Sequence, residues 1–460
     1  MSLTPQSYWA EYAWTGGRVA PGVVVETTAE GRIGAVRTDV PAPPVGAITL
    51  PGLTLPGLAN AHSHAFHRAL RGTVQAGAGT FWTWREVMYA VAGRLTPENY
   101  FALAKAVYAE MALAGITCVG EFHYVHHRPG GAPYADPNAM GEALIAAAHE
   151  AGIRITLLDT VYLSSGFGAA PEPHQLRFSD GDAEAWAERA SALSDGPHVR
   201  IGAAVHSVRA VPAGELGTVA RWAREREAPL HVHLSEQPAE NEACQAAHGV
   251  TPTRLLADHG VLGPRTSAVH ATHLTAEDIA LLGGSGTTIC MCPTTERDLA
   301  DGIGPARALQ EAGSPLSLGS DSHAVIDLFE EARAMELDER LRTRTRGHWT
   351  AAALLGAATA DGHACLGWPD GGRLEPGALA DFTTVALDSA RTAGPPPGLG
   401  AETAVFAATN ADVRHTVVGG RHIVRDGSHQ FVRDVGGALR AAIADLSAGT
   451  AELADEGNPS

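Results

Sequence analysis

Short apolar runs and longer amphipathic stretches alternate along most of the chain. The apolar runs predict strands, and apolar residues that recur at helical spacing between them predict helices. Thr96 followed by Pro97 marks the start of one such helix. The expected strands are residues 53–64, 116–122, 153–162, 199–205, 230–234, 267–270, 287–292 and 316–319, and the clearest other helices are residues 140–151, 216–227, 275–282 and 328–341.

This alternation predicts the α/β class, and within it a (β/α)8 barrel of the TIM type. Eight parallel strands that alternate with helices close into a barrel whose active site lies at the carboxyl ends of the strands. An open, doubly wound sheet is the alternative, but no Gly-rich phosphate loop follows the first strand. We therefore expect polar residues at the strand ends to carry the chemistry.

Two β-like regions flank the barrel pattern. Short β runs separated by Gly and Pro precede it, and the pattern becomes β-like again after residues 376–381, at residues 382–386 and 416–424. The two flanks could pair into one small β domain although they are far apart in the sequence. The expected domains are residues 1–56 as the first part of the small β domain, residues 57–375 as the barrel, and residues 376–460 as its second part with a C-terminal helix.

The composition is that of a compact globular protein, with 45% hydrophobic and 18% charged residues among 460. No window approaches about eighteen consecutive apolar residues, and the first residues lack the basic and apolar regions of a signal peptide. We expect a soluble, cytoplasmic protein. The net charge of -18 argues against nucleic acid or an anionic membrane as the main partner, because both require a basic face.

The five cysteines are odd in number and scattered, which favours reduced thiols over a disulfide framework. Cys290 and Cys292 could form a soft metal pair. They lie in an apolar run that predicts a buried strand, where cysteine behaves as a small hydrophobic residue, so the structural interpretation is favoured.

His62 and His64 end the first expected strand. Side chains two apart on a strand point to the same face, so the two imidazoles project together and could form half of a zinc-type site. With 22 histidines in the chain, such a pair could also arise by chance. The pair gains weight because polar residues also end later strands: His233 with Glu236 three residues on, His270, and Asp321.

Only one of the 33 basic residues is a lysine, Lys105, and it falls on a surface-type helix. Barrels with two bridged metals commonly use a carboxylated lysine at a strand end, so a single metal is the simpler interpretation. His62, His64, His233 and Asp321 would leave one position for water. A bound Zn²⁺ lowers the pKa of that water from roughly 15.7 toward about 7.

The chain resembles the amidohydrolase superfamily in its mononuclear deaminase branch, and within it the formimidoylglutamate deiminases. The motifs that carry the resemblance are His-Ser-His-Ala-Phe-His-Arg-Ala at 62–69, Phe-Trp-Thr-Trp-Arg at 81–85, Glu-Phe-His-Tyr-Val-His-His at 121–127, His-Ser-Val-Arg at 206–209, Cys-Pro-Thr-Thr-Glu at 292–296 and Gly-Ser-Asp-Ser-His at 319–323. It implies hydrolysis of N-formimidoyl-L-glutamate to N-formyl-L-glutamate and ammonia in histidine degradation. It also suggests a homodimer.

The resemblance implies that His62, His64, His233 and Asp321 hold one Zn²⁺ per subunit, although Fe²⁺ also suits such ligands. Glu236 would then be the proton shuttle, and Asp321 with His270 would orient and deprotonate the attacking water.

The implied substrate is a small molecule with two carboxylates, which guanidinium groups can bind through paired hydrogen bonds. Arg85 and Arg209 are the candidates for these contacts, and Tyr124 and His206 resemble further polar contacts. Arg85 lies in the segment 81–85, expected as a substrate loop, and could instead stack on Trp82 or Trp84. Arg209 could equally form a salt bridge at the rim of the site.

The sequence departs from the family pattern at His67, where the resemblance leads us to expect Gln. A histidine keeps the capacity to hydrogen-bond, but it could change the pH dependence or admit a related acid.

Two other functions are compatible with parts of this pattern. A nucleobase deaminase, acting on a cyclic amidine such as guanine, would use the same metal site with aromatic stacking in place of the two arginines. A non-catalytic barrel that binds a metal is less consistent with a shuttle residue beside the ligands, because structural zinc sites are usually closed.

Overall fold

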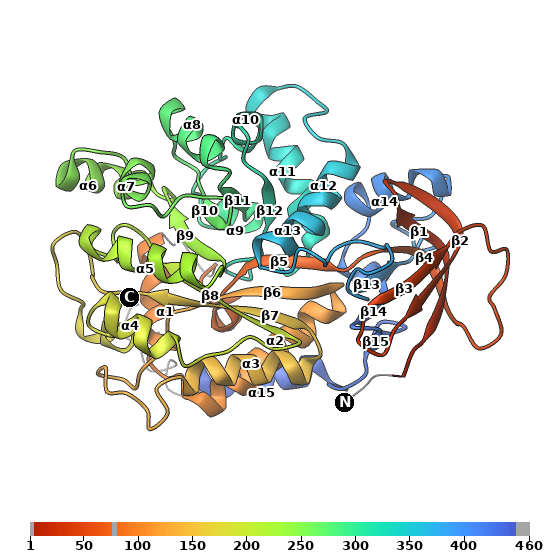
Figure 1. Ribbon diagram of the computed structural model, residues 1–460, viewed down its shortest axis with the longest axis horizontal. Helices are drawn as coiled ribbons and strands as arrows, with labels where there is room; N and C mark the ends of the chain where they lie inside the picture. The colour runs from red at the N-terminus through yellow and green to blue at the C-terminus, as the bar shows by residue number, and fades with distance from the viewer. Residues whose placement is uncertain (1–3, 76–80, 448–460) are drawn as a thin grey trace, which may run out of the picture.

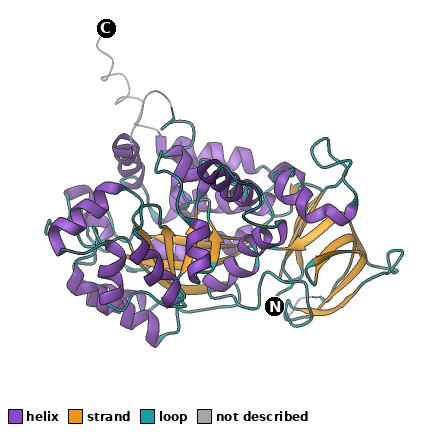
Figure 2. Cartoon of the chain, turned by 90° about the horizontal axis from the view of Figure 1, so that it is seen from above, coloured by secondary structure: helices purple, strands orange, loops and turns teal. Residues whose placement is uncertain are grey.

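The computed structural model describes residues 4–75 and 81–447. Its larger part is an eight-stranded parallel sheet curled into a barrel with helices around it (Figures 1 and 2). The strands neighbour one another in chain order: β5 (Leu58–Ser63), β6 (Ile116–His123), β7 (Arg154–Val161), β8 (Val199–Val205), β9 (Leu230–Leu234), β10 (Thr266–His270), β11 (Thr288–Met291) and β12 (Leu316–Leu318). The predicted (β/α)8 barrel is confirmed.

The helices begin where the sequence provides capping residues. At α2, Thr96 Oγ1 accepts a hydrogen bond from the amide of Asn99 at 3.3 Å, and the Asn99 side-chain oxygen accepts one from the amide of Thr96 at 2.7 Å. Thr275 and Asp278 form the same arrangement at α8. The helices are α1 (Phe81–Ala92), α2 (Pro97–Leu113), α3 (Ala139–Ala151), α4 (Ala183–Ala190), α5 (Ala213–Glu225), α6 (Pro238–His248), α7 (Pro252–Asp258), α8 (Ala276–Ser285), α9 (Pro293–Asp298), α10 (Ala306–Ala312), α11 (Leu328–Thr343), α12 (Ala351–Ala358), α13 (Ala360–Cys365), α14 (Gly400–Phe406) and α15 (Val435–Ser447).

A second eight-stranded sheet combines the two flanks of the chain, and Figure 1 shows it beside the barrel. Strands from opposite ends of the sequence meet where β13 pairs antiparallel with β4. The N-terminal strands are β1 (Ser7–Thr15), β2 (Arg18–Thr27), β3 (Ile33–Arg37) and β4 (Ile48–Pro56), and the C-terminal strands are β13 (Phe382–Val385), β14 (Val413–Val418), β15 (Arg421–Arg425) and β16 (Ser428–His429). The expected pairing of the flanks into one β unit is therefore observed.

A buried ion pair joins the barrel to this sheet. Arg154 at the start of β7 donates two hydrogen bonds to the carboxylate of Asp381, at 2.6 and 3.1 Å. The amide of Gly419 donates to the same carboxylate at 2.6 Å. Both charged side chains are almost fully buried, so each depends on the other to remain ionised in the interior.

Three expected elements differ from the observed ones. Residues 53–64 are two strands in two sheets, because the chain turns at Gly57, where a Cβ atom would lie 2.2 Å from the Thr117 hydroxyl. Residues 416–424 are divided into β14 and β15 by Gly419 and Gly420, both with positive φ. The segment 81–85, expected as a loop, is the first part of helix α1.

A charged network fills the space between β7 and α4. Arg189 donates hydrogen bonds of 2.8 to 2.9 Å to both oxygens of Asp159 and of Asp180. His123, His126 and Asp159 lie close enough to hold a metal ion, but the guanidinium already provides the positive charge that this carboxylate needs. Although burial alone would raise their pKa values, Arg189 and neighbouring histidines hold the pKa of both carboxyl groups below the ordinary range.

No helix in the described part of the chain has both the length and the apolar character needed to cross a membrane. All five cysteines are buried and free, as expected for reduced thiols.

Candidate active site

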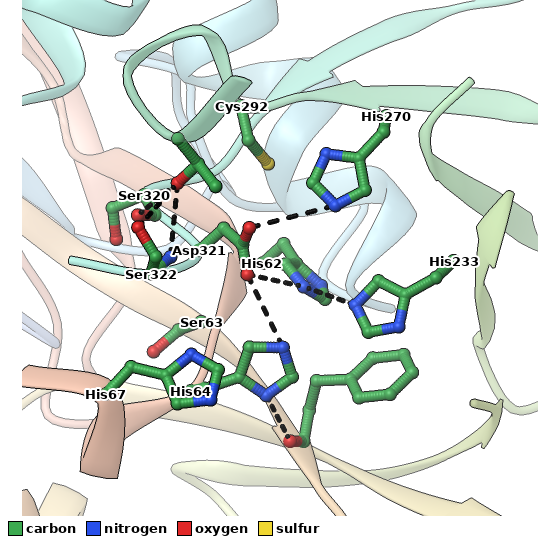
Figure 3. A network of polar contacts seen from close by, with 12 residues as sticks. His62, Ser63, His64, His67, His233, His270, Cys292, Ser320, Asp321 and Ser322 are labelled. Atoms are coloured by element: carbon green, nitrogen blue, oxygen red, sulfur yellow. Dashed lines mark hydrogen bonds and ion pairs between the residues drawn. The ribbon is translucent and has the colours of Figure 1, made fainter. Parts of the chain in front are cut away.

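Three imidazoles and one carboxylate converge at the carboxyl ends of the barrel strands (Figure 3). His62 Nε2 lies 3.3 Å and His64 Nε2 lies 3.4 Å from the same oxygen of Asp321. His233 Nε2 lies 3.1 Å from His62 Nε2. The donor atoms of these four residues all lie within 4.8 Å of one another. The sequence predicted this group, and the fold brings its members together.

The hydrogen bonds around this group leave its nitrogens free to bind a metal ion. His64 Nδ1 faces the carbonyl of Phe122 at 2.9 Å, and His233 Nδ1 faces the carbonyl of His206 at 2.9 Å. A proton on each Nδ1 satisfies these carbonyls and leaves the Nε2 lone pair directed toward Asp321. Burial lowers the pKa of all three imidazoles, which keeps them neutral as metal ligands must be. The residues present therefore fit a divalent metal ion.

The ligand group spans the seam between the first and last barrel strands. A parallel bridge joins Ser63 to Asp321, and the amide of Asp321 donates to the carbonyl of His62 at 3.0 Å. Gly319 makes this close approach possible, because a Cβ atom there would lie 2.7 Å from the Cβ of His62. His323 lies 3.0 Å from the Ser63 hydroxyl, so side chains reinforce the seam.

His270 ends β10 among three carboxylates. Its Nδ1 lies 3.4 Å from Glu296, and its Nε2 lies 3.7 Å from Asp321 and 3.9 Å from Glu236. Burial alone would lower the pKa of His270, but the carboxylates outweigh it and raise that pKa well above the ordinary value. The imidazole therefore holds a proton readily beside the candidate metal site.

Glu236 lies on the loop that follows β9, with its side chain 19% exposed. Burial, with the charges of Asp321 and Glu240, raises the pKa of Glu236 from 4.5 to about 7, although His270 and Arg209 oppose the shift. Glu240 also accepts a hydrogen bond of 3.1 Å from the amide of Ser235, which fixes the turn. A carboxyl group with a pKa near neutrality can both donate and accept a proton during turnover.

One cavity connects these groups to the residues predicted to bind substrate. It is lined by the metal-ligand candidates His64, His233 and Asp321, by Glu236 and His270, and by His67, Arg85, Tyr124, His206 and Arg209. The structure thus brings the predicted site residues to one place, and the donor atom of His62 lies within 4.8 Å of those of His64, His233 and Asp321.

The two arginines differ in their surroundings. Arg85 donates a hydrogen bond to the hydroxyl of Tyr89 at 2.7 Å and lies over that ring at 5.2 Å. The side chain of Trp82, a proposed stacking partner, lies outside the described part. Arg209 has no carboxylate within 4.0 Å among residues 4–75 and 81–447, so the expected alternative of a salt bridge at the rim is not observed there.

His67 is buried against Tyr124, with 3.3 Å between its Nε2 and the phenol oxygen. Burial lowers the pKa of His67 to about 3, so the ring is neutral across the physiological range. The suggestion that His67 changes the pH dependence is therefore not supported, and its contribution is limited to hydrogen bonding and shape.

The sequence reasoning missed several residues that line the cavity, among them Tyr89, Tyr162 and Glu240. Tyr89 is four residues after Arg85 on α1, so helical spacing could have identified it once the helix was placed. Glu240 lies in the first turn of α6, the helix that begins two residues after Glu236. Tyr162 immediately follows β7 and could have been found as a strand-end residue.

Several known proteins are similar to this chain. The model of the amidohydrolase family matches residues 53–423. The formimidoylglutamate deiminase of Pseudomonas aeruginosa is 38% identical over 89% of this chain and 92% of its own length, and the 8-oxoguanine deaminase of the same species is 33% identical over 82% and 83%. A crystal structure of an amidohydrolase from Brucella melitensis superposes with a TM-score of 0.87 at 33% identity, covering 96% of this chain and 99% of the other.

Proposed function

Because the chain belongs to the amidohydrolase family, and is a hydrolase that acts on C–N bonds of amidines, we propose that it converts N-formimidoyl-L-glutamate to N-formyl-L-glutamate and ammonia. One observation supports the choice of this substrate. Arg85 and Arg209 line the same cavity as the metal-ligand candidates. A linear substrate with an amidine at one end and two carboxylates at the other matches that distribution of charge.

In this proposal His62, His64, His233 and Asp321 hold one zinc ion per subunit, with ferrous iron as the alternative. When bound, the ion lowers the pKa of a coordinated water toward about 7 and polarises the carbon–nitrogen bond. The same proposal includes a homodimer in the cytoplasm, acting in histidine degradation, and light scattering of the purified protein tests the dimer.

The protein's own residues move the protons. Asp321 and His270 orient the attacking water and accept its proton, since the His270 ring lies among carboxylates that stabilise its charged form. Glu236 delivers a proton to the nitrogen that leaves as ammonia and takes up one from the attacking water as the carbonyl group forms, and a pKa of about 7 permits both transfers.

Substrate orientation comes from other residues that line the cavity. Arg209 and Arg85 bind the two carboxylates, while Tyr124 and His206 face the chain between them. His67 supports Tyr124 through their 3.3 Å contact. These residues place the formimidoyl carbon near the metal-ligand group.

A nucleobase deaminase is the second candidate, because aromatic rings also line the cavity and the 8-oxoguanine deaminase is a relative. The deciding experiment measures ammonia release from N-formimidoyl-L-glutamate, N-formimidoyl-L-aspartate, guanine and adenine by the zinc-loaded protein. Rapid release from the first substrate supports the proposal. Release from a nucleobase with none from the formimidoyl acids would overturn it.

Two variants test the substrate contacts directly. Arg209→Met and Arg85→Met should each lower kcat/KM for N-formimidoyl-L-glutamate by roughly 10–150-fold, because a hydrogen bond to a charged group is worth about 1.5–3 kcal/mol. Arg221→Met, an exposed arginine of α5 paired with Glu184, is the matched control. Unchanged kinetics in both cavity variants would exclude a dicarboxylate held by these arginines.

A further inference from the structure

A second group of metal-binding side chains adjoins the first. The donor atoms of His270, Cys292 and Asp321 lie within 4.8 Å of one another, and all three residues are buried. Figure 3 shows the Cys292 thiol on the side of the Asp321 carboxylate that faces His270, away from His62 and His64. The donors are an imidazole, a thiol and a carboxylate, a set that suits zinc and cadmium better than magnesium or calcium.

Asp321 has one oxygen for each group. Its Oδ1 lies 3.3 and 3.4 Å from the nitrogens of His62 and His64, whereas its Oδ2 lies 3.7 Å from His270 Nε2. A carboxylate arranged in this way can bridge two cations. The second group therefore does not require the first to be empty.

The Nε2 atom of His270 is available to a cation. A proton on Nδ1 faces Glu296 at 3.4 Å, which leaves the lone pair on Nε2. The nearest carboxylate oxygens to Nε2 are those of Asp321 and Glu236, at 3.7 and 3.9 Å, beyond the length of a hydrogen bond. A metal ion bound to Nε2 would occupy this space.

The electrostatic environment favours a cation at this point. The carboxylates of Glu236, Glu296 and Asp321 surround His270, and Arg209 offsets part of the charge of Glu236. A divalent cation would replace the proton that His270 can hold and the proton of the Cys292 thiol, because a thiol bound to a metal is deprotonated.

We propose that His270, Cys292 and Asp321 form a second, weaker site for a thiophilic divalent cation such as zinc or cadmium, and that filling this site inhibits the hydrolase. Inhibition follows because His270 and Asp321, once bound to the second ion, can no longer accept the proton of the attacking water. The inhibitory part rests on the proposed function, whereas the binding part does not.

The binding test needs no substrate. Protein loaded with one zinc per chain is titrated with Cd²⁺, and bound metal is counted after dialysis while the thiolate-to-cadmium absorption band is recorded. The first site contains no cysteine, so exchange there produces no such band. We expect two ions per chain with the band in the parent protein, and one ion without the band in Cys292→Ala and Cys292→Ser.

Cys290→Ala is the matched control, because Cys290 is a buried thiol two residues away on β11 but belongs to neither donor group. It should keep both the second ion and the band. Retention of the second ion and band by the Cys292 variants, or a parent protein that binds one ion only, would overturn the inference. Two Cys292 substitutions guard against misfolding of one, which circular dichroism would reveal.

The activity test compares each protein with and without excess zinc. The parent should lose activity, whereas Cys292→Ala should require at least about 10–100-fold more zinc for the same loss, because that factor is typical when a residue that only orients a ligand is lost, and Cys292 is proposed as a ligand itself. Identical zinc sensitivity of parent and variant would contradict the inhibitory role. Failure to hydrolyse N-formimidoyl-L-glutamate would count against the proposed function alone, since the cadmium titration would still report the second ion.

Discussion

Replacing Glu236 with glutamine should abolish proton transfer and yet stabilise the fold at high pH. The carboxyl group of Glu236 is largely buried on the loop after β9, and its pKa is raised from 4.5 to about 7, chiefly by burial. Glutamine has nearly the same shape but never ionises. The substitution therefore tests the role of Glu236 in proton transfer and its effect on the free energy of unfolding separately.

The size of both effects follows from the environment of the residue. The unfolded chain ionises at 4.5 and the folded chain only at about 7, so rising pH favours the unfolded state between these two values. At about 1.4 kcal/mol per pH unit, the wild-type protein loses about 3 kcal/mol of stability that the variant keeps. Loss of a general acid–base group should lower kcat by about 10²–10⁴-fold.

The assay is urea unfolding of metal-free wild type and Glu236→Gln between pH 5 and pH 8.5. We expect the difference in free energy of unfolding between the two proteins to change by about 2–3 kcal/mol in favour of the variant as the pH rises. This is most of the total of about 3 kcal/mol, because the range starts above the unfolded pKa. Glu242→Gln removes an exposed carboxylate from the adjacent helix, α6, and controls for the change of net charge. A difference that does not vary with pH, or that favours the wild type at pH 8.5, would refute the assignment of a raised pKa.

Three further substitutions test the fold and the cavity. Arg189→Met should lower the free energy of unfolding by about 3–5 kcal/mol at pH 7, because it leaves buried carboxylates unpaired. Arg189 helps to hold the pKa of Asp180 below 3.8, so this loss should become smaller below about pH 4, where the carboxyl groups take up protons. Urea unfolding at a series of acid pH values measures the change. Asp381→Asn should destabilise by a similar amount of about 3–5 kcal/mol by stranding Arg154 between barrel and small sheet, and an unchanged urea midpoint would contradict this. His67→Gln should keep kcat/KM for N-formimidoyl-L-glutamate within about tenfold, the value of one ordinary hydrogen bond, and a loss beyond a hundredfold would mean that the imidazole itself contacts the reacting groups.

The barrel could be predicted from the sequence because its strands are short apolar runs with clear limits. The expected strand 199–205 and the strand 230–234 coincide with β8 and β9. The metal-ligand candidates could be predicted for the same reason, since a parallel barrel brings the carboxyl ends of all its strands to one face. Knowledge of the order of the strands was enough to place His62, His233 and Asp321 together.

The remaining features depend on contacts between distant residues, which hydrophobic patterns do not report. The division of residues 53–64 between two sheets follows from the approach of Thr117 to Gly57, sixty residues apart in the chain. The raised pKa of Glu236 arises from burial and from the charges of Asp321 and Glu240. The aromatic segment 81–85 was expected as a substrate loop because the connection after His64 is too long for a routine turn, whereas in the folded chain it begins helix α1.

The position of the metal-ligand candidates has a structural consequence as well as a chemical one. Among the described residues a single parallel bridge, Ser63 to Asp321, links the first barrel strand to the last. A metal ion held by His62 and His64 on one side of that seam and by Asp321 on the other would cross-link the two strands where the hydrogen-bonded ladder is weakest. Ligands that bind only the folded state stabilise it. The residues that would activate water are therefore also placed to close the barrel. Gly319, directly after β12, permits this approach to His62 because it has no side chain.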